Sequence, residues 1–176
     1  MGRGDEAKDT SGFVCSFLET ALDFGASRDS VLHLLNRAML RRREECSATV
    51  DLFELDLLTG EATFVKSGSA PSFIKRDSSI FRIKSQTAPL GLMKSIDSEK
   101  IRVEVRAGDI LVMLSDGVAQ TAEESTWLVE LLSRKPRGNL KEYAELILSE
   151  AKKHTDGKDD MSVIVAKIGE VGQKKG

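Results

Sequence analysis

Two aspartates each adjoin an apolar run of the kind that forms a buried strand. Asp116 lies just after the run 110–114, and Asp159 lies just before the segment 161–168. If these two strands are antiparallel neighbours, the end of one meets the start of the other, so the two carboxylates converge at the rim of a sheet. Converging carboxylates suit a hard divalent cation, because Mg²⁺ and Mn²⁺ prefer oxygen ligands. The pattern therefore predicts a candidate metal site.

The residues beside these aspartates fit two interpretations. Gly117 lets backbone or a ligand come close to Asp116, and Asp160 places a second carboxylate beside Asp159. Asp and Gly are also common in turns, so an unrelated β-sandwich with aspartates in its turns would have the same sequence motifs. No spacing rule along the chain links the two motifs. The residues alone leave both interpretations open, and a large separation between Asp116 and Asp159 would favour the second.

Other residues with chemical potential are interpreted as structural. His33 and His154 have no partner at metal-ligand spacing, so both are expected to be structural or surface residues. Cys15 and Cys46 are expected to be small buried hydrophobes. Asp51 is a charge inside an apolar strand, where an unpaired buried carboxylate is costly. It therefore lies either at an exposed edge or in a bonded position near the site.

Helices at both ends of the chain enclose a series of strands. The first two helices are amphipathic and joined by a short loop, which predicts antiparallel packing. The spacing of the hairpins suggests a β-sandwich or meander. The expected helices cover residues 6–24, 27–43, 126–132 and 140–151, and the expected strands cover 48–58, 61–67, 72–76, 80–83, 101–105, 110–114 and 161–168.

The composition suits one globular domain. The chain has 176 residues, 40% of them apolar, with 26 Lys+Arg, 28 Asp+Glu and a net charge of −2. This balance argues against a disordered chain and gives no general attraction to nucleic acid. No run approaches the roughly 20 apolar residues of a membrane span. Two cysteines without a secretory leader indicate a reducing compartment, so we expect a cytoplasmic location.

The two acidic motifs, in this order and context, resemble those of the metal-dependent PPM (type 2C) serine/threonine phosphatases. Within that family, the chain is most similar to the stage II sporulation protein E branch. Most of the similar stretches are weak individually, but together they keep the family order and span nearly the whole chain. They are residues 49–53 with 56–57, 65–74, 89–92, 107–118 and 159–165.

The resemblance implies an α+β fold, the αββα sandwich of two antiparallel sheets flanked by antiparallel helix pairs. It implies hydrolysis of phosphoserine and phosphothreonine by a water molecule that two Mn²⁺ or Mg²⁺ ions activate. By the same resemblance Asp116 and Asp159 are metal ligands, with Gly117 and Asp160 as further candidates. Asp160 stands where the family has Asn, a variation that this branch tolerates. The implied substrate is a phosphorylated protein, an anti-sigma-factor antagonist.

The start of the chain departs from the family pattern. Met1-Gly2-Arg3-Gly4 resembles the second half of an Asp-Gly-Met-Gly motif whose Asp and Gly carry metal-binding groups in the family. We therefore expect a partial sandwich, with residues 1–168 forming the C-terminal part of a phosphatase domain and residues 169–176 a disordered tail. Two acidic ligands of the family and its first strands would be missing, and unpaired strand edges favour self-association.

These expectations lead to two hypotheses of different classes. The first is a PPM-type phosphatase whose activity in this chain is weak or lost. The second is a non-catalytic, phosphatase-like module that binds a partner protein. The resemblance leaves open whether upstream sequence anchors the complete protein to a membrane.

Overall fold

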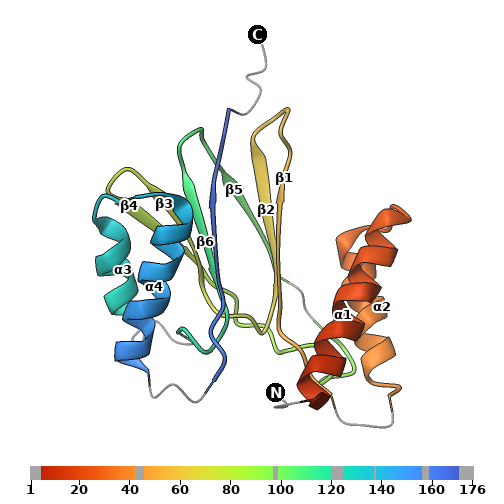
Figure 1. Cartoon of the computed structure of the whole chain (residues 1–176). Coiled ribbons are helices and arrows are strands. Elements are labelled where there is room, and N and C mark those ends of the chain that lie inside the picture. The colour runs from red at the N-terminus through yellow and green to blue at the C-terminus, as the bar shows by residue number, and fades with distance from the viewer. Residues whose placement is uncertain are drawn as a thin grey trace. The chain divides into compact units, whose positions relative to one another are not determined.

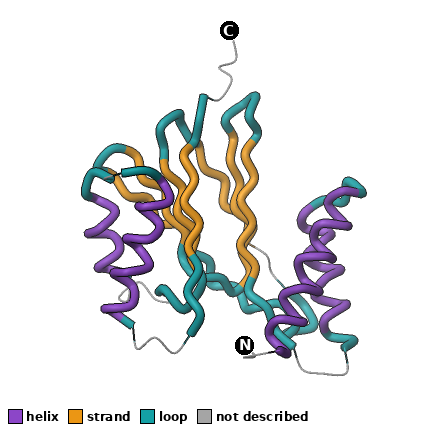
Figure 2. Tube along the Cα trace, viewed as in Figure 1, coloured by secondary structure: helices purple, strands orange, loops and turns teal. Residues whose placement is uncertain are grey.

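The computed structural model describes residues 5–42, 46–96, 99–119, 125–136, 138–155 and 159–170 (Figures 1 and 2). The described residues form four helices and two antiparallel sheets, which confirms the predicted α+β class. The glycine-rich start at residues 1–4 and the tail residues 171–176 lie outside them. The elements in chain order are α1 (Asp5–Asp23), α2 (Arg28–Met39), β1 (Val50–Leu55), β2 (Glu61–Ser67), β3 (Ser72–Arg76), β4 (Ser79–Ile83), β5 (Glu99–Glu104), β6 (Ile110–Leu114), α3 (Thr126–Ser133), α4 (Leu140–His154) and β7 (Val163–Lys167).

The chain divides into two compact units. The first unit comprises Met1–Leu52, Val65–Gly68 and Gln86–Lys100. The second unit comprises Phe53–Phe64, Ser69–Ser85 and Ile101–Gly176. The three-stranded sheet has the order β1-β2-β5, and the four-stranded sheet has the order β4-β3-β6-β7.

The helix pair α1–α2 belongs to the first unit. Gly25, at a φ of 74°, ends the α1 region in the left-handed conformation that glycine adopts readily. Ser27 then caps α2, because its side chain accepts a hydrogen bond from the Ser30 backbone N–H at 3.3 Å. The two helices pack against each other and share a core with the start of β1 and the end of β2. That core consists of Val14, Leu32, Leu35, Met39, Val50, Val65, Leu90 and Ile96.

The four-stranded sheet lies wholly in the second unit and is covered by α3 and α4 on one face (Figure 1). Because side chains alternate along a strand, Val112 of β6 packs among the residues of these helices while Leu111 packs on the opposite face. β6 is thus buried on both faces, as its continuous apolar sequence predicts. α4 begins with a capping box, in which the side chains of Asn139 and Glu142 each accept a hydrogen bond from the other's backbone N–H.

The second helix, expected over 27–43, ends at Met39, and further sequence-based predictions are wrong. The strand expected over 48–58 ends at Leu55, because the Asp56 carboxylate accepts hydrogen bonds from the backbone N–H groups of Leu58 and Thr59 and starts a turn there. Cys15, expected to be buried, is exposed, since the buried stripe of α1 runs along another face of that helix. Among the described residues, no helix combines the length and apolar character needed to cross a membrane.

Candidate metal centre

The end of β6 lies beside the start of β7, as the sequence predicts. The two strands pair antiparallel, with Leu114 opposite Val163 and Met113 opposite Ile164. A strand that leaves the sheet after Leu114 therefore emerges where β7 enters it. This register brings the loop that carries Asp116 to the same edge of the sheet as the loop that carries Asp159.

Ser115 joins these two loops through hydrogen bonds. Its backbone N–H donates to the Ser162 carbonyl at 3.0 Å, which extends the strand pairing by one step. Its hydroxyl accepts from the Ser162 N–H at 2.8 Å and donates to the Asp160 carbonyl at 3.3 Å. The sequence gives no hint of this role, because a serine after an apolar strand is compatible with any turn. The three bonds fix the backbone on either side of the candidate ligands.

Gly117 is the point where the two loops touch. A Cβ atom on this residue would lie 2.4 Å from the Asp160 carbonyl oxygen and 3.3 Å from the Asp159 carbonyl carbon. Real Cβ atoms do not approach backbone this closely, so the contact requires glycine. The close approach that the sequence suggested for Gly117 is therefore made to the 159–160 backbone of this same chain.

The acidic side chains at this edge differ in their surroundings. Asp116 is half-buried, whereas Asp159 and Asp160 are exposed. Carboxylate oxygens are ligands that a hard divalent cation prefers, and water can complete the coordination shell of Mg²⁺. Two touching loops that both carry carboxylates are therefore compatible with such a cation. Within the described ranges, however, no cluster of three or more His, Cys, Asp or Glu side chains is positioned to hold a metal. The described residues thus bring two loops with acidic side chains together at one end of the sheet.

Asp51 lies in the first unit on β1, an edge strand of the three-stranded sheet, but its side chain is only 11% exposed and is paired. Its Oδ2 atom accepts a hydrogen bond of 2.5 Å from Lys66 Nζ, and the Lys66 side chain is fully buried. Burial lowers the pKa of the Lys66 ammonium, and the nearby Asp51 carboxylate opposes that shift. Lys66 is not among the residues that the sequence patterns single out, although a lone lysine inside the apolar strand 61–67 is a usable signal.

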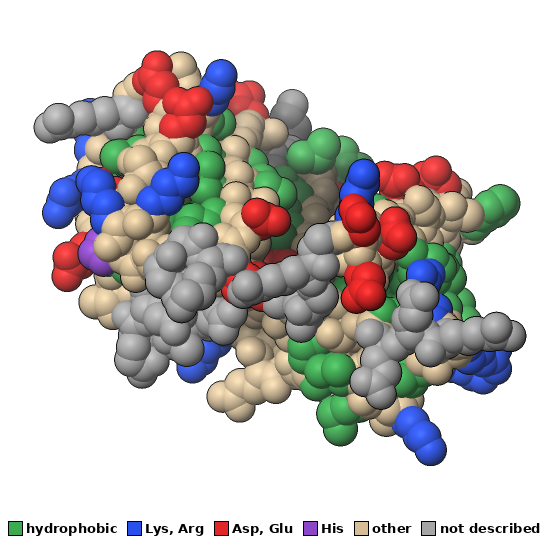
Figure 3. All heavy atoms as spheres, turned by 60° about the horizontal axis from the view of Figure 1, so that its bottom comes forward, with side chains coloured by type: hydrophobic (Ala, Val, Ile, Leu, Met, Phe, Trp, Pro, Cys, Tyr) green, Lys and Arg blue, Asp and Glu red, His purple; other side chains and the backbone are tan. Residues whose placement is uncertain are grey.

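The histidines and cysteines have the exposure or contacts of surface or structural residues within their own units. His33 is exposed on α2, and the His154 ring stacks on Trp127 with ring centroids 5.0 Å apart. Cys46, also expected to be buried, is only half-buried, and neither it nor the exposed Cys15 forms a disulfide bond with a described residue. On the face shown in Figure 3, acidic and basic side chains both occur, and the basic ones lie at several separate places.

Comparison with known protein families shows to which family this chain belongs. The family model described as Stage II sporulation protein E (SpoIIE) matches residues 1–169. The chain belongs to the SpoIIE family. Stage II sporulation protein E of Bacillus subtilis is 30% identical in an alignment 175 residues long, which covers 96% of this chain and 21% of that protein. The chain therefore spans about a fifth of the length of this curated relative.

Solved structures give the same assignment. The PP2C phosphatase domain of B. subtilis SpoIIE, solved with a fragment of its regulatory domain, has a TM-score of 0.83 and 28% identity over 96% of this chain and 52% of that chain. The catalytic domain of the serine/threonine phosphatase PstP of Mycobacterium tuberculosis, solved with two manganese ions, has a TM-score of 0.72 and 19% identity. That match covers 96% of this chain and 84% of the PstP chain and shows a shared fold. This SpoIIE-family chain thus has the PP2C fold.

Proposed function

We propose that this chain takes part in metal-dependent hydrolysis of phosphoserine or phosphothreonine on a protein substrate. The observation that carries the proposal is the contact between the loop of Asp116 and the loop of Asp159, in a chain of the SpoIIE family. Each loop presents a carboxylate at the same edge of the four-stranded sheet. These two carboxylates are the proposed ligands.

Each residue at this edge has a distinct proposed role. Asp116 and Asp159 hold divalent cations, Mn²⁺ or Mg²⁺, which when bound stabilise developing negative charge and lower the pKa of a coordinated water molecule. Gly117 allows the two loops to approach and leaves its own backbone near the ligands. Asp160 adds a further negative charge beside the site. Ser115 positions the loops rather than reacting, since its hydroxyl already bonds to backbone on both sides.

The proposed substrate is a phosphorylated anti-sigma-factor antagonist. The support for this choice is membership of the SpoIIE family together with the proposed phosphatase chemistry. We further propose that the chain by itself binds metal weakly and turns over little or no substrate. Two carboxylates provide few of the oxygen ligands that a pair of hard cations needs, and within the described residues no group of three acidic, His or Cys side chains is placed to hold a metal together.

A phosphatase assay with a phosphoserine protein and Mn²⁺ tests the proposal. It compares this chain with a chimera whose N-terminus is extended by the residues that precede the matched region in the B. subtilis relative. In the extended version, Asp116→Ala is expected to lower kcat/KM by at least about 100-fold, because a lost metal ligand removes several kcal/mol of charge stabilisation. The exposed residue Glu145 of α4 supplies the control, Glu145→Ala, which also removes one negative charge.

The outcomes separate the parts of the proposal. Undiminished metal-dependent activity in Asp116→Ala would remove Asp116 from the ligand set. Full activity of the chain alone would contradict its proposed weakness. Equal losses in Asp116→Ala and Glu145→Ala would point to a general charge effect instead of ligation.

A second candidate function is a non-catalytic module that binds a partner protein. The observation in its favour is the lack of a third metal-ligating side chain at this edge within the described residues. Calorimetry with the phosphorylated and unphosphorylated partner, in the presence of EDTA, distinguishes it from the phosphatase. Tight binding of the phosphoprotein without metal would favour the module.

A further inference from the structure

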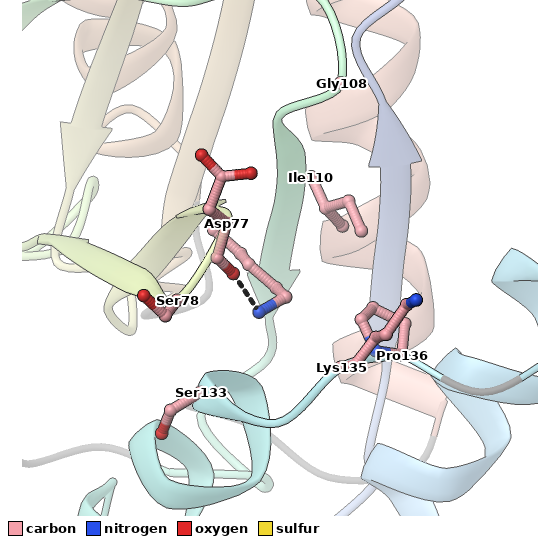
Figure 4. A pocket seen from close by; sticks show the side chains of 8 residues that line it. Asp77, Ser78, Gly108, Ile110, Ser133, Lys135 and Pro136 are labelled. Carbon is pink, nitrogen blue, oxygen red and sulfur yellow. Dashed lines mark hydrogen bonds between the residues drawn. The ribbon is translucent and has the colours of Figure 1, made fainter.

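A pocket of about 410 Å³ lies in the second unit, at the opposite end of β6 from Asp116 (Figure 4). Ile110, the first residue of β6, forms part of its wall, whereas Asp116 follows the last. The volume falls in the range of about 300–1,000 Å³ that is typical of sites for small organic molecules. The lining residues are Lys75, Asp77, Ser78, Gly108, Ile110, Ser133, Lys135 and Pro136.

The most unusual residue of this pocket is Lys75. Only 5% of its surface is exposed, and its Nζ atom donates one hydrogen bond, of 2.6 Å, to the Asp77 carbonyl oxygen (Figure 4, dashed line). An ammonium group has three donors, so the contacts within the described residues satisfy one of them. Burial lowers the pKa of Lys75, an effect that the nearby Asp77 charge partly offsets. A buried cation with spare donors in a cavity wall favours an anionic partner.

The other walls add a second cation and an apolar surface. Lys135 is exposed at the rim, and Ile110 and Pro136 provide apolar contact area. The Asp77 carboxylate turns away from Ser133 and Lys135, so it does not occupy the space in front of them (Figure 4). The Ser133 hydroxyl donates to the carbonyls of Val129 and Glu130 at 2.7 and 3.1 Å, which leaves it only acceptor capacity.

We propose that this pocket binds a small organic anion. Its phosphoryl or carboxyl group accepts hydrogen bonds from the buried Lys75 ammonium, and its apolar body lies against Ile110 and Pro136. Lys135 closes the rim with a second positive charge. The site is separate from the candidate metal centre, because the five residues of β6 rise about 3.3 Å each and separate the two ends by more than 10 Å.

Titration of the ¹⁵N-labelled chain tests the proposal with three probes, in EDTA so that no divalent cation binds the anion elsewhere. Phenylphosphonate carries both an anion and a ring, inorganic phosphate only the anion, and benzyl alcohol only the ring. We expect saturable shifts at the amides of Lys75, Gly108 and Ile110 with phenylphosphonate. Millimolar affinity is expected for a probe of about ten non-hydrogen atoms, with weaker binding of both other probes.

Matched lysine variants identify which positive charge binds the anion. Lys75→Met is expected to weaken phenylphosphonate binding at least about tenfold, because it removes charge-assisted hydrogen bonds from a buried site. Lys135→Met, at the exposed rim, is expected to weaken it about threefold. Lys84 is exposed and does not line the pocket, so Lys84→Met removes the same charge and is expected to leave binding unchanged.

Several results would overturn the proposal. Shifts that do not saturate, or that avoid these three amides in the unmodified chain, would mean that Lys75 only stabilises the turn at Asp77. Equal weakening in Lys84→Met and Lys135→Met would mean general charge attraction. The amide map of the unmodified chain and the Lys135→Met variant decide the matter even if Lys75→Met fails to fold.

Discussion

The hydroxyl of Ser115 accepts a hydrogen bond of 2.8 Å from the backbone N–H of Ser162 and so fastens the exit of β6 to the start of β7. Ser115→Ala removes this bond and the bond to the Asp160 carbonyl. We expect the free energy of unfolding to fall by about 1–2 kcal/mol, since each intramolecular hydrogen bond contributes about 1 kcal/mol net. Manganese affinity should fall as well, because the two ligand loops become less ordered relative to each other.

Urea denaturation and manganese titration check the Ser115 prediction. Ser149 supplies the control, since its hydroxyl donates to the Leu146 carbonyl within α4 and lies in the helix rather than in either loop. Ser149→Ala should leave manganese affinity unchanged. A Ser115→Ala protein with unaltered metal affinity would contradict the positioning role of Ser115.

Gly117→Ala should damage the same region by steric contact. The new Cβ would lie 2.4 Å from the Asp160 carbonyl oxygen, so one loop must move away from the other. We expect a loss of about 1–3 kcal/mol in the free energy of unfolding, as for overpacked sites. Gly12→Ala is the matched control, because a Cβ there meets nothing within 4 Å. Within helix α1, that change should raise stability by about 0.5–1 kcal/mol.

Denaturation curves of these two glycine variants should therefore shift in opposite directions. A Gly117→Ala protein as stable as the unmodified chain would show that the two loops can separate without cost. That result would weaken the case for a preformed pair of ligand loops.

The sequence predicted the elements that carry strong local signals. β6 was recognisable because it is apolar on both faces, and the start of α2 was recognisable from Ser27. The pairing of β6 with β7 could be stated only as a condition, since nothing local specifies which strands are neighbours. The register of Leu114 with Val163 is a property of the folded sheet.

Polar contacts between residues distant in the sequence are the least predictable part of the fold. Lys66 and Asp51 are 15 residues apart, and their meeting depends on strand pairing that the letters do not show. The amide of Asn36 is similar, because it accepts from the Gly91 N–H and donates to the Met93 carbonyl more than 50 residues away. Each of these hydrogen bonds depends on the tertiary fold, so composition and periodicity do not predict it.

The Arg76–Asp109 pair explains the aspartate in the Ala107-Gly108-Asp109 turn. Arg76 donates from Nε to Oδ1 at 2.9 Å and from Nη2 to Oδ2 at 2.7 Å, and Asp109 is 2% exposed. Asp109→Ala should lower the free energy of unfolding by about 3–5 kcal/mol, because the change breaks a buried pair. Arg76→Lys should cost less, since it retains the charge but loses the bidentate geometry. An Arg76→Lys protein as stable as the unmodified chain, by urea denaturation, would contradict a bidentate role.

The buried Lys66–Asp51 pair should be sensitive to removal of either charge. Asp51→Asn leaves the fully buried Lys66 ammonium without its carboxylate, and breaking a buried pair costs about 3–5 kcal/mol. The solvent-accessible pair Lys153–Glu150 on α4 serves as the control, in which Glu150→Gln should leave the free energy of unfolding nearly unchanged. Comparable losses at the two sites would mean that Lys66 reaches solvent after Asp51 is neutralised.

The lowered pKa of Lys66 predicts the direction in which stability changes with pH. Because burial lowers this pKa in the folded state, the unfolded chain binds more protons at this lysine than the folded chain does. The difference exists between the lowered folded pKa and the ordinary lysine value of about 10.4. The Lys66 contribution to stability therefore rises as pH increases through that window. Lys66→Met removes the titrating group and with it this contribution.

Denaturant unfolding of the unmodified chain and Lys66→Met, measured from neutral pH to about pH 10, should show the stability difference shifting in favour of the unmodified chain. Lys84→Met is the control, since Lys84 is exposed, and its difference from the unmodified chain should stay constant over the same range. A difference for Lys66→Met that shifts the other way as pH rises would mean that the Asp51 carboxylate outweighs burial and raises the pKa of Lys66.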